Sequence, residues 1–106
     1  MSNVLYPKAE EFEKLLNDGI LLADFYSERC MPCRMLAPII ETLADDYDGK
    51  VNVVKFNVDD EGRELALSLG IESIPTVIIF KGGSEYAREI GYMPLEHYTK
   101  ILDNIL

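Results

Sequence analysis

The amino-acid sequence predicts an α/β fold in which four helices cover both faces of a mixed five-stranded sheet, giving a three-layer α/β/α sandwich. Strand-like and helix-like hydrophobic patterns alternate along most of the chain. Such alternation is typical of parallel strands joined by right-handed crossovers. Near the end, two strand patterns flank the tight turn 81–84, which predicts an antiparallel hairpin. The expected order is β-α-β-α-β-α-β-β-α.

Four elements are expected in the first half of the chain. Residues 4–6 are a short strand candidate, and apolar residues at helical spacing predict a helix over 8–18 that Gly19 ends. The almost continuously apolar run 20–26 is typical of a central parallel strand covered on both faces. From residue 32 to about residue 47 the apolar positions recur with the period of a helix.

The second half supplies the remaining strands and helices. Residues 51–58 are rich in strand-forming residues, and 61–69 form a short helical pattern. Residues 76–80 and 85–90 are the two strands of the expected hairpin. Apolar residues over 95–105 predict a final amphipathic helix.

Length, composition and charge restrict the function classes. A chain of 106 residues with 48% hydrophobic residues fits one domain, 1–106, with enough apolar material for a core. Its net charge of −9 argues against nucleic acid and anionic membrane surfaces as partners. No apolar run approaches the ~18 residues of a membrane span, and the first residues lack the pattern of a signal peptide. We therefore expect a cytoplasmic monomer.

The two cysteines of the chain, Cys30 and Cys33, predict redox chemistry. At the start of a helix they share one face of its first turn, so their Cα atoms can lie within the ~4.4–6.8 Å of a disulfide. Closing so small a loop adds little to stability. In the expected compartment, a lone Cys-x-x-Cys is more often redox-active or metal-binding than structural.

The roles of the two thiols follow from their positions. Attack on a disulfide requires a thiolate, and the N-terminus of a helix favours the anion of Cys30. The preceding Arg29 adds positive charge, and Pro32 suits a first helical turn. Cys33 lies further into the helix and keeps its proton longer. We therefore predict that Cys30 attacks and that Cys33 resolves the mixed disulfide.

Asp24 is the candidate for the proton transfer that resolution requires. It interrupts an apolar strand, where desolvation raises the pKa of a carboxyl group. A raised pKa makes the group a usable general base near neutral pH.

Several segments carry a resemblance to a known family. The segment 23–38, with Cys30-Met31-Pro32-Cys33, is followed in order by 55–59, 70–76, 80–83 and Gly91. Together they resemble the thioredoxin family over essentially the whole chain. Thioredoxins are themselves an example of a Cys-x-x-Cys thiol with a lowered pKa.

The resemblance implies the thioredoxin fold and a protein-disulfide reductase. It implies no bound cofactor or metal beyond the redox-active disulfide Cys30–Cys33. The implied partners are disulfide-containing proteins and a separate thioredoxin reductase, NADPH- or ferredoxin-dependent. It also implies that Asp24 lies beneath the disulfide and acts through a water, and that Lys55 tunes Asp24.

The resemblance further implies a docking groove for extended substrate chains. The Ile74–Pro75 peptide bond would be cis and face the cysteine pair, so that the backbone of Ile74 can pair with a substrate segment. Gly91 would line the same groove because a missing side chain permits close approach. Tyr92 and Val58 would extend the docking surface.

The chain also departs from the family pattern. Arg29 stands where most thioredoxins carry tryptophan, and Met31 stands where they carry glycine. Tyr26 occupies a further position where tryptophan is frequent. Arg29 changes a flat apolar contact surface into a cation, and both Arg29 and Met31 are expected to tune the reduction potential.

Three alternative functions stay open at this point. A metal-binding module needs more ligands than two thiolates, and His97 is distant in sequence. A non-catalytic interaction module has no need of both cysteines, Asp24 and Pro75. An isomerase or a glutathione-linked oxidoreductase would require an atypical reduction potential.

Overall fold

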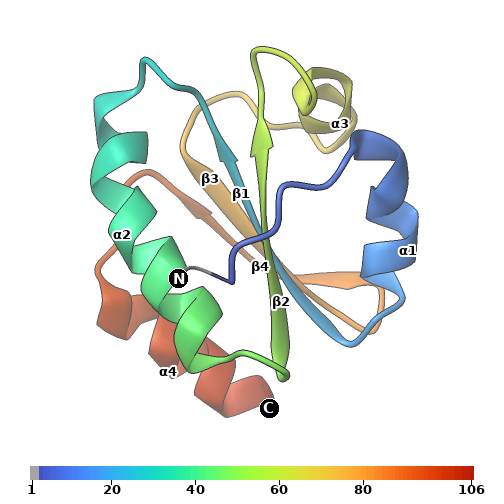
Figure 1. The fold of residues 1–106 in the computed structure, drawn as a ribbon, viewed down its shortest axis with the longest axis vertical. Helices are drawn as coiled ribbons and strands as arrows, with labels where there is room; N and C mark the ends of the chain where they lie inside the picture. Colours follow the sequence, from blue (N-terminus) through green and yellow to red (C-terminus); the bar gives the residue numbers. More distant parts are fainter. Residues whose placement is uncertain (1–2) are drawn as a thin grey trace.

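A four-stranded mixed sheet forms the centre of the molecule in the computed structural model, which describes residues 3–106. The strand order is β2-β1-β3-β4 (Figure 1). Strand β1 runs parallel to β2 and antiparallel to β3, and β3 and β4 form the predicted hairpin. The strands are β1 (Ile20–Tyr26), β2 (Val51–Asn57), β3 (Thr76–Lys81) and β4 (Ser84–Ile90).

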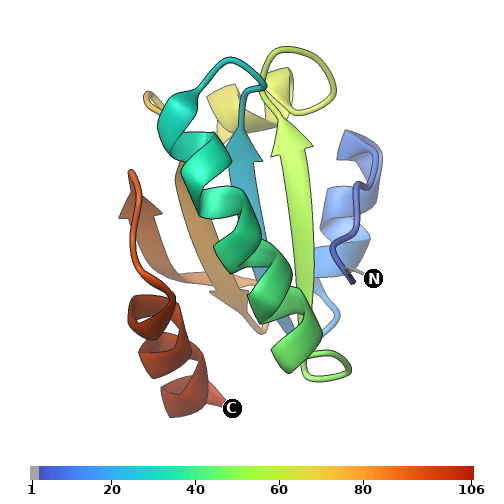
Figure 2. The ribbon, with the colours of Figure 1, turned by 60° about the vertical axis from the view of Figure 1, so that its left-hand side comes forward.

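Helices cover both faces of this sheet, which confirms the predicted three-layer sandwich (Figures 1 and 2). Helices α2 and α4 lie on one face, and α1 and α3 lie on the other. The helices are α1 (Phe12–Leu16), α2 (Met31–Asp46), α3 (Arg63–Ser68) and α4 (Leu95–Ile105). A short 3₁₀ helix, Ala9–Glu11, precedes α1, so the helix expected over 8–18 is divided in two.

The prediction of five strands is wrong, because residues 4–6 do not form a strand. Leu5 makes an isolated parallel bridge to Val54 at the outer edge of β2. Its N–H donates to Val53 O and its carbonyl accepts from Lys55 N, both at 2.9 Å. Pro7 has no N–H with which to continue the ladder. The pairing therefore ends after a single bridge.

The alternation of side chains along each strand divides the core into two clusters. Leu22 of β1 packs toward α2 and α4, whereas its neighbours Leu21 and Ala23 pack toward α1 and α3. Because the period of a strand is two, Asp24 shares the face of Leu22. The strand thus directs one carboxylate into the layer that contains α2.

Gly62, just before α3, allows the helix to pack closely against the end of β2. A Cβ at this position would lie 2.7 Å from Phe56 Cβ and 3.1 Å from Asn57 O. Both atoms belong to the fixed part of β2, so neither can move aside easily.

We therefore predict that Gly62→Ala lowers the free energy of unfolding by about 1–3 kcal/mol through overpacking. Urea denaturation at neutral pH would measure the change. Lys100→Ala, on the exposed face of α4, serves as the control and should change stability by less than about 0.5 kcal/mol. Equal effects of the two substitutions would contradict the packing argument.

Candidate functional site

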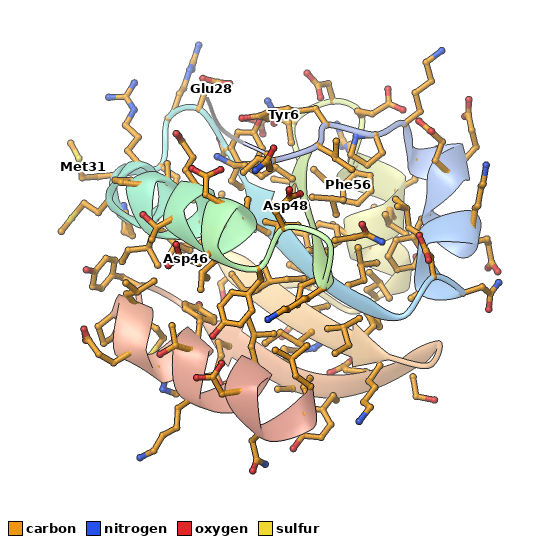
Figure 3. All side chains as sticks on the ribbon, turned by 60° about the horizontal axis from the view of Figure 1, so that its bottom comes forward. Tyr6, Glu28, Met31, Asp46, Asp48 and Phe56 are labelled. Carbon is orange, nitrogen blue, oxygen red and sulfur yellow. A yellow bond between two sulfur atoms is a disulfide. The ribbon has the colours of Figure 1, made fainter. Side chains whose placement is uncertain are left out.

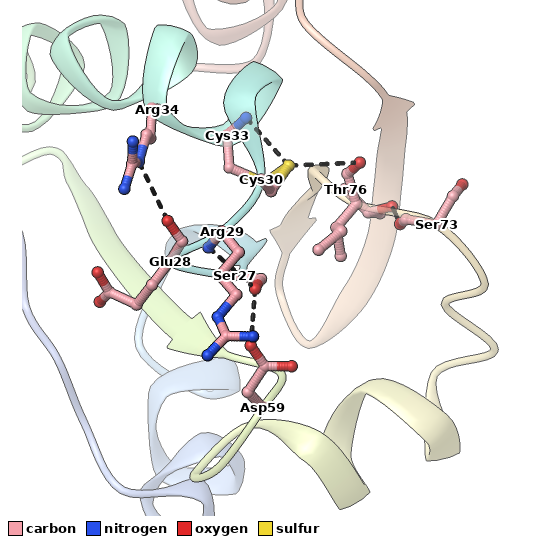
Figure 4. The surroundings of a disulfide bond; sticks show 10 residues. Ser27, Glu28, Arg29, Cys30, Cys33, Arg34, Asp59, Ser73 and Thr76 are labelled. Atoms are coloured by element: carbon pink, nitrogen blue, oxygen red, sulfur yellow. Dashed lines mark hydrogen bonds between the residues drawn. A yellow bond between two sulfur atoms is a disulfide. The ribbon is translucent and has the colours of Figure 1, made fainter.

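The two cysteines form a disulfide where β1 gives way to α2 (Figure 4). Their Cα atoms are 5.1 Å apart, within the range expected from the sequence. Cys30 is the N-cap of α2, and its Sγ accepts a hydrogen bond from the N–H of Cys33 at 3.2 Å. Cys30 is half-buried, whereas Cys33 is 3% exposed. A sulfur that accepts an N–H of the first helical turn is well placed to be stabilised as an anion.

A buried serine fixes the loop that leads into the disulfide. The Ser27 hydroxyl donates to Asp59 Oδ2 at 2.6 Å and accepts from the N–H of Arg29 at 3.4 Å (Figure 4). The Ser27 carbonyl accepts from the N–H of Cys30 at 3.3 Å. Our sequence reasoning missed Ser27, although a serine three residues before a helix N-cap is a recurring turn signal.

The loop before β3 faces the disulfide. The Ile74–Pro75 peptide bond is cis, as the family resemblance implied. The carbonyl oxygen of Ile74 lies 3.9 Å from Cys30 Sγ. Gly91 is held at the same place because its N–H donates to the Pro75 carbonyl at 2.8 Å. Ile74, Pro75 and Gly91 therefore meet beside Cys30.

The other expected docking residues lie around this point at different depths. Val58 and Ile74 line a shallow, mostly apolar pocket of about 260 Å³, together with Leu67 and Ile71. Tyr92 is exposed on the segment after Gly91. Beside the disulfide, Arg29, Met31 and Pro32 are exposed, and Met31 projects into solvent from the start of α2 (Figure 3).

Asp24 is fully buried on the α2 side of β1. Within residues 3–106 neither of its carboxylate oxygens has a hydrogen-bond partner. Burial raises the pKa of Asp24 to about 7, and the positive charge of Lys55 partly opposes that rise. Lys55 is the cross-strand neighbour of Asp24 on β2, and its Nζ lies 4.3 Å from the centroid of the Tyr26 ring. Asp24 is thus a buried carboxyl group that can gain or lose a proton near neutral pH.

Residues 3–106 contain no group of three or more His, Cys, Asp or Glu side chains that could hold a metal ion. None of the helices in this part of the chain is long and apolar enough to cross a membrane.

A sequence model of the thioredoxin family matches residues 3–104. The chain belongs to the thioredoxin family. It is 40% identical to a thioredoxin of Staphylococcus epidermidis over 96 residues, which cover 91% of each chain. A thioredoxin of Staphylococcus haemolyticus is 40% identical over 95 residues, or 90% of each chain. The solved structure of a mutant thioredoxin from Halobacterium salinarum NRC-1 superimposes with a TM-score of 0.88 at 31% identity, covering 99% of this chain and 94% of that one.

Family membership and the Cys30–Cys33 disulfide together establish the type of chemistry. The protein is a thiol-disulfide oxidoreductase that acts by dithiol-disulfide exchange, with this pair as its redox-active centre.

The raised pKa of Asp24 predicts how stability depends on pH. A carboxyl group whose pKa rises from 3.8 to about 7 on folding binds its proton more tightly in the folded state. The contribution of Asp24 to stability is therefore present below about pH 4 and is lost as pH rises through about 7. Asp24→Asn cannot ionise, so it should exceed the wild type in unfolding free energy at pH 8 by on the order of 4 kcal/mol.

Urea unfolding of the oxidised wild type and variant at pH 4, 6 and 8 would test this difference. The gap between the two proteins should widen with pH. A constant gap would show that Asp24 does not titrate with a raised pKa.

Proposed function

We propose that the protein is a protein-disulfide reductase in which Cys30 is the attacking thiolate and Cys33 the resolving thiol. The observation that carries the proposal is the asymmetry of the pair. Cys30 is partly exposed, caps α2 and faces the Ile74 carbonyl, whereas Cys33 is buried. An incoming disulfide can therefore approach Cys30 first.

The proposed reaction transfers two electrons to the substrate in two exchanges. The Cys30 thiolate attacks one sulfur of the substrate disulfide, and the other substrate sulfur leaves as a thiolate. Cys33 then gives its proton to the Asp24 carboxylate and attacks Cys30 Sγ. The Cys30–Cys33 disulfide forms, and the second substrate sulfur leaves and takes up a proton. A separate thioredoxin reductase returns the pair to the dithiol.

The proposed substrate lies along the loop that faces Cys30. Ile74 offers its backbone next to the reacting sulfur, and Pro75 and Gly91 hold that loop in place. A Cβ added at Gly91 would meet no heavy atom within 4 Å, so a partner backbone has room to approach. Val58 and Tyr92 extend the contact surface on either side.

Four further residues are proposed to tune the centre. Lys55 moderates the pKa of Asp24 through its charge. Pro32 fixes the first turn of α2, where Cys30 is stabilised. Arg29 and Met31 are exposed beside the disulfide and act on partner choice and reduction potential. A single domain, a monomeric state and a cytoplasmic location stay predictions from the sequence.

Two serine variants test the roles of the thiols. We expect Cys30→Ser to abolish turnover of a disulfide-containing protein such as insulin, because no attacking thiolate remains. Cys33→Ser should instead accumulate a long-lived mixed disulfide through Cys30, visible on non-reducing gels and by mass spectrometry. Rapid adduct formation through Cys33 in the Cys30→Ser protein would reverse the assignment.

Asp24→Asn tests the proton acceptor. Without the carboxylate, resolution of the mixed disulfide should slow at least about tenfold at pH 7. The difference in resolution rate between wild type and variant should narrow at higher pH, where Cys33 loses its proton to solvent. Rapid-mixing kinetics of mixed-disulfide decay between pH 6 and 9 would measure this, with Asp46→Asn on the exposed face of α2 as control. An unchanged rate would make Asp24 structural.

A further inference from the structure

One register of the sheet carries three polar residues, Asp24, Lys55 and Glu89, on the face that α2 and α4 cover, with Val77 between Asp24 and Glu89. Asp24 of β1 is paired with Lys55 of β2 on one side and with Val77 of β3 on the other. Val77 is in turn paired with Glu89 of β4. Paired residues project from the same face of a sheet, so these four side chains form one line beneath the helices.

Tyr98 of α4 lies in the core on this same face. Its side chain is fully buried and belongs to the same cluster as Leu22 and Val77. Within residues 3–106 its hydroxyl has no hydrogen-bond partner, as is also true of the Asp24 carboxylate. Burial, followed by the negative charges of Asp24 and Glu89, raises the pKa of Tyr98, so the hydroxyl keeps its proton and remains a donor.

Glu89 is the rival acceptor for that hydroxyl, but its side chain is partly open to solvent. Its Oε1 lies 3.0 Å from Nε2 of His97, although within residues 3–106 that buried nitrogen also lacks a hydrogen-bond partner. Asp24, in contrast, is closed off from water and has only the charge of Lys55 to balance its own. Of the two carboxylates near Tyr98, Asp24 therefore gains more from a donor.

Two buried polar groups without partners in one core would each be costly. A single buried water can satisfy both, because such waters occupy polar sites with two to four partners. We propose that Tyr98 is a positioning residue for Asp24, and that its hydroxyl donates to a buried water which in turn donates to the Asp24 carboxylate. The water both orients the carboxylate toward Cys33 and favours its ionised form.

Other titratable groups also surround Asp24. Lys55 favours the ionised carboxylate, and Cys33 of α2 is its proposed proton donor. Tyr6 and Tyr26 are near enough for the charge of Asp24 to contribute to their raised pKa values, and neither carries charge near neutral pH. From α4, Tyr98 is the titratable residue whose pKa is raised by the charge of Asp24. The charge of Glu89 also raises the pKa of Tyr98, and Glu89 lies 3.0 Å from His97.

The inference rests on the proposed role of Asp24, and Tyr98→Phe tests it by removing one hydroxyl while keeping the ring. Loss of the donor should raise the pKa of Asp24 by roughly one unit. Carbon-13 NMR titration of the Asp24 carboxyl, assigned with Asp24→Asn, would measure that shift. Resolution of the mixed disulfide at pH 7 should slow about two- to fivefold, since a one-unit rise of a pKa near 7 lowers the ionised fraction of Asp24 by that factor.

Tyr47→Phe is the matched control. The Tyr47 hydroxyl donates to Asp103 Oδ1 at 2.6 Å in the same layer, so its loss should lower stability without moving the Asp24 titration. If Tyr98→Phe left the Asp24 titration unmoved and raised the melting temperature, the proposal would be overturned. The wild-type Tyr98 hydroxyl would then be buried without any partner, so that removing it stabilises the fold. If Tyr98→Phe shifted the titration of His97 and left that of Asp24 unmoved, the proposal would also be overturned. The Tyr98 hydroxyl would then be bonded to Glu89, the neighbour of His97.

The NMR readout also separates this inference from the proposed function. An unchanged resolution rate in Asp24→Asn would remove the catalytic role of Asp24, whereas the carboxyl titration would still report whether Tyr98 is linked to it.

Discussion

Strand β1 is hydrogen-bonded along both edges and covered by helices on both faces, so its register is fixed from four directions. A shift by one residue would move every side chain to the opposite face. This constraint places Asp24 beneath α2 and, at the end of the strand, delivers Cys30 to the N-cap of that helix. The partner strands add the remaining parts, because β2 brings Lys55 beside Asp24 and the start of β3 brings Ile74 and Pro75 to the disulfide. The site is therefore a consequence of how one strand is held.

Burying Asp24 has opposite effects on stability and on reactivity. Ionising a carboxyl group in this core costs free energy, and the same cost raises its pKa to about 7. An acid that titrates near neutral pH can accept a proton and later release it, which an exposed aspartate does poorly. Lys55 limits the cost without abolishing it, since its ammonium group also lies over the Tyr26 ring. The stabilising effect expected of Asp24→Asn and its expected loss of proton transfer thus have one physical origin.

The parts of this molecule that could be predicted are those marked by a local pattern in the sequence. Alternating apolar runs located the four strands and four helices, and the Cys-x-x-Cys spacing located the redox pair. Residues 4–6 were mistaken for a strand because a local pattern, even one that ends at Pro7, cannot show that the pairing is an isolated bridge between Leu5 and Val54. Tyr98 could not be singled out either, since its helical spacing is that of an ordinary core residue and only the fold shows that its buried hydroxyl has no hydrogen-bond partner among residues 3–106. Ser27 depended on a contact with Asp59, which is 32 positions away.

The outer edge of β2 shows how the molecule limits where another chain can add to it. Each residue of this strand that faces the open edge has a backbone N–H or carbonyl group that is already hydrogen-bonded within its own chain. The Val51 N–H bonds Tyr47, the Val53 carbonyl and Lys55 N–H bond Leu5, and the Asn57 carbonyl bonds Gly62. At the opposite edge, β4 carries the ion pair Arg88–Glu85, and charged side chains discourage strand addition. An extended polypeptide thus meets occupied or charged sheet edges, which agrees with the proposal that a substrate segment pairs with the backbone of Ile74, beside Cys30.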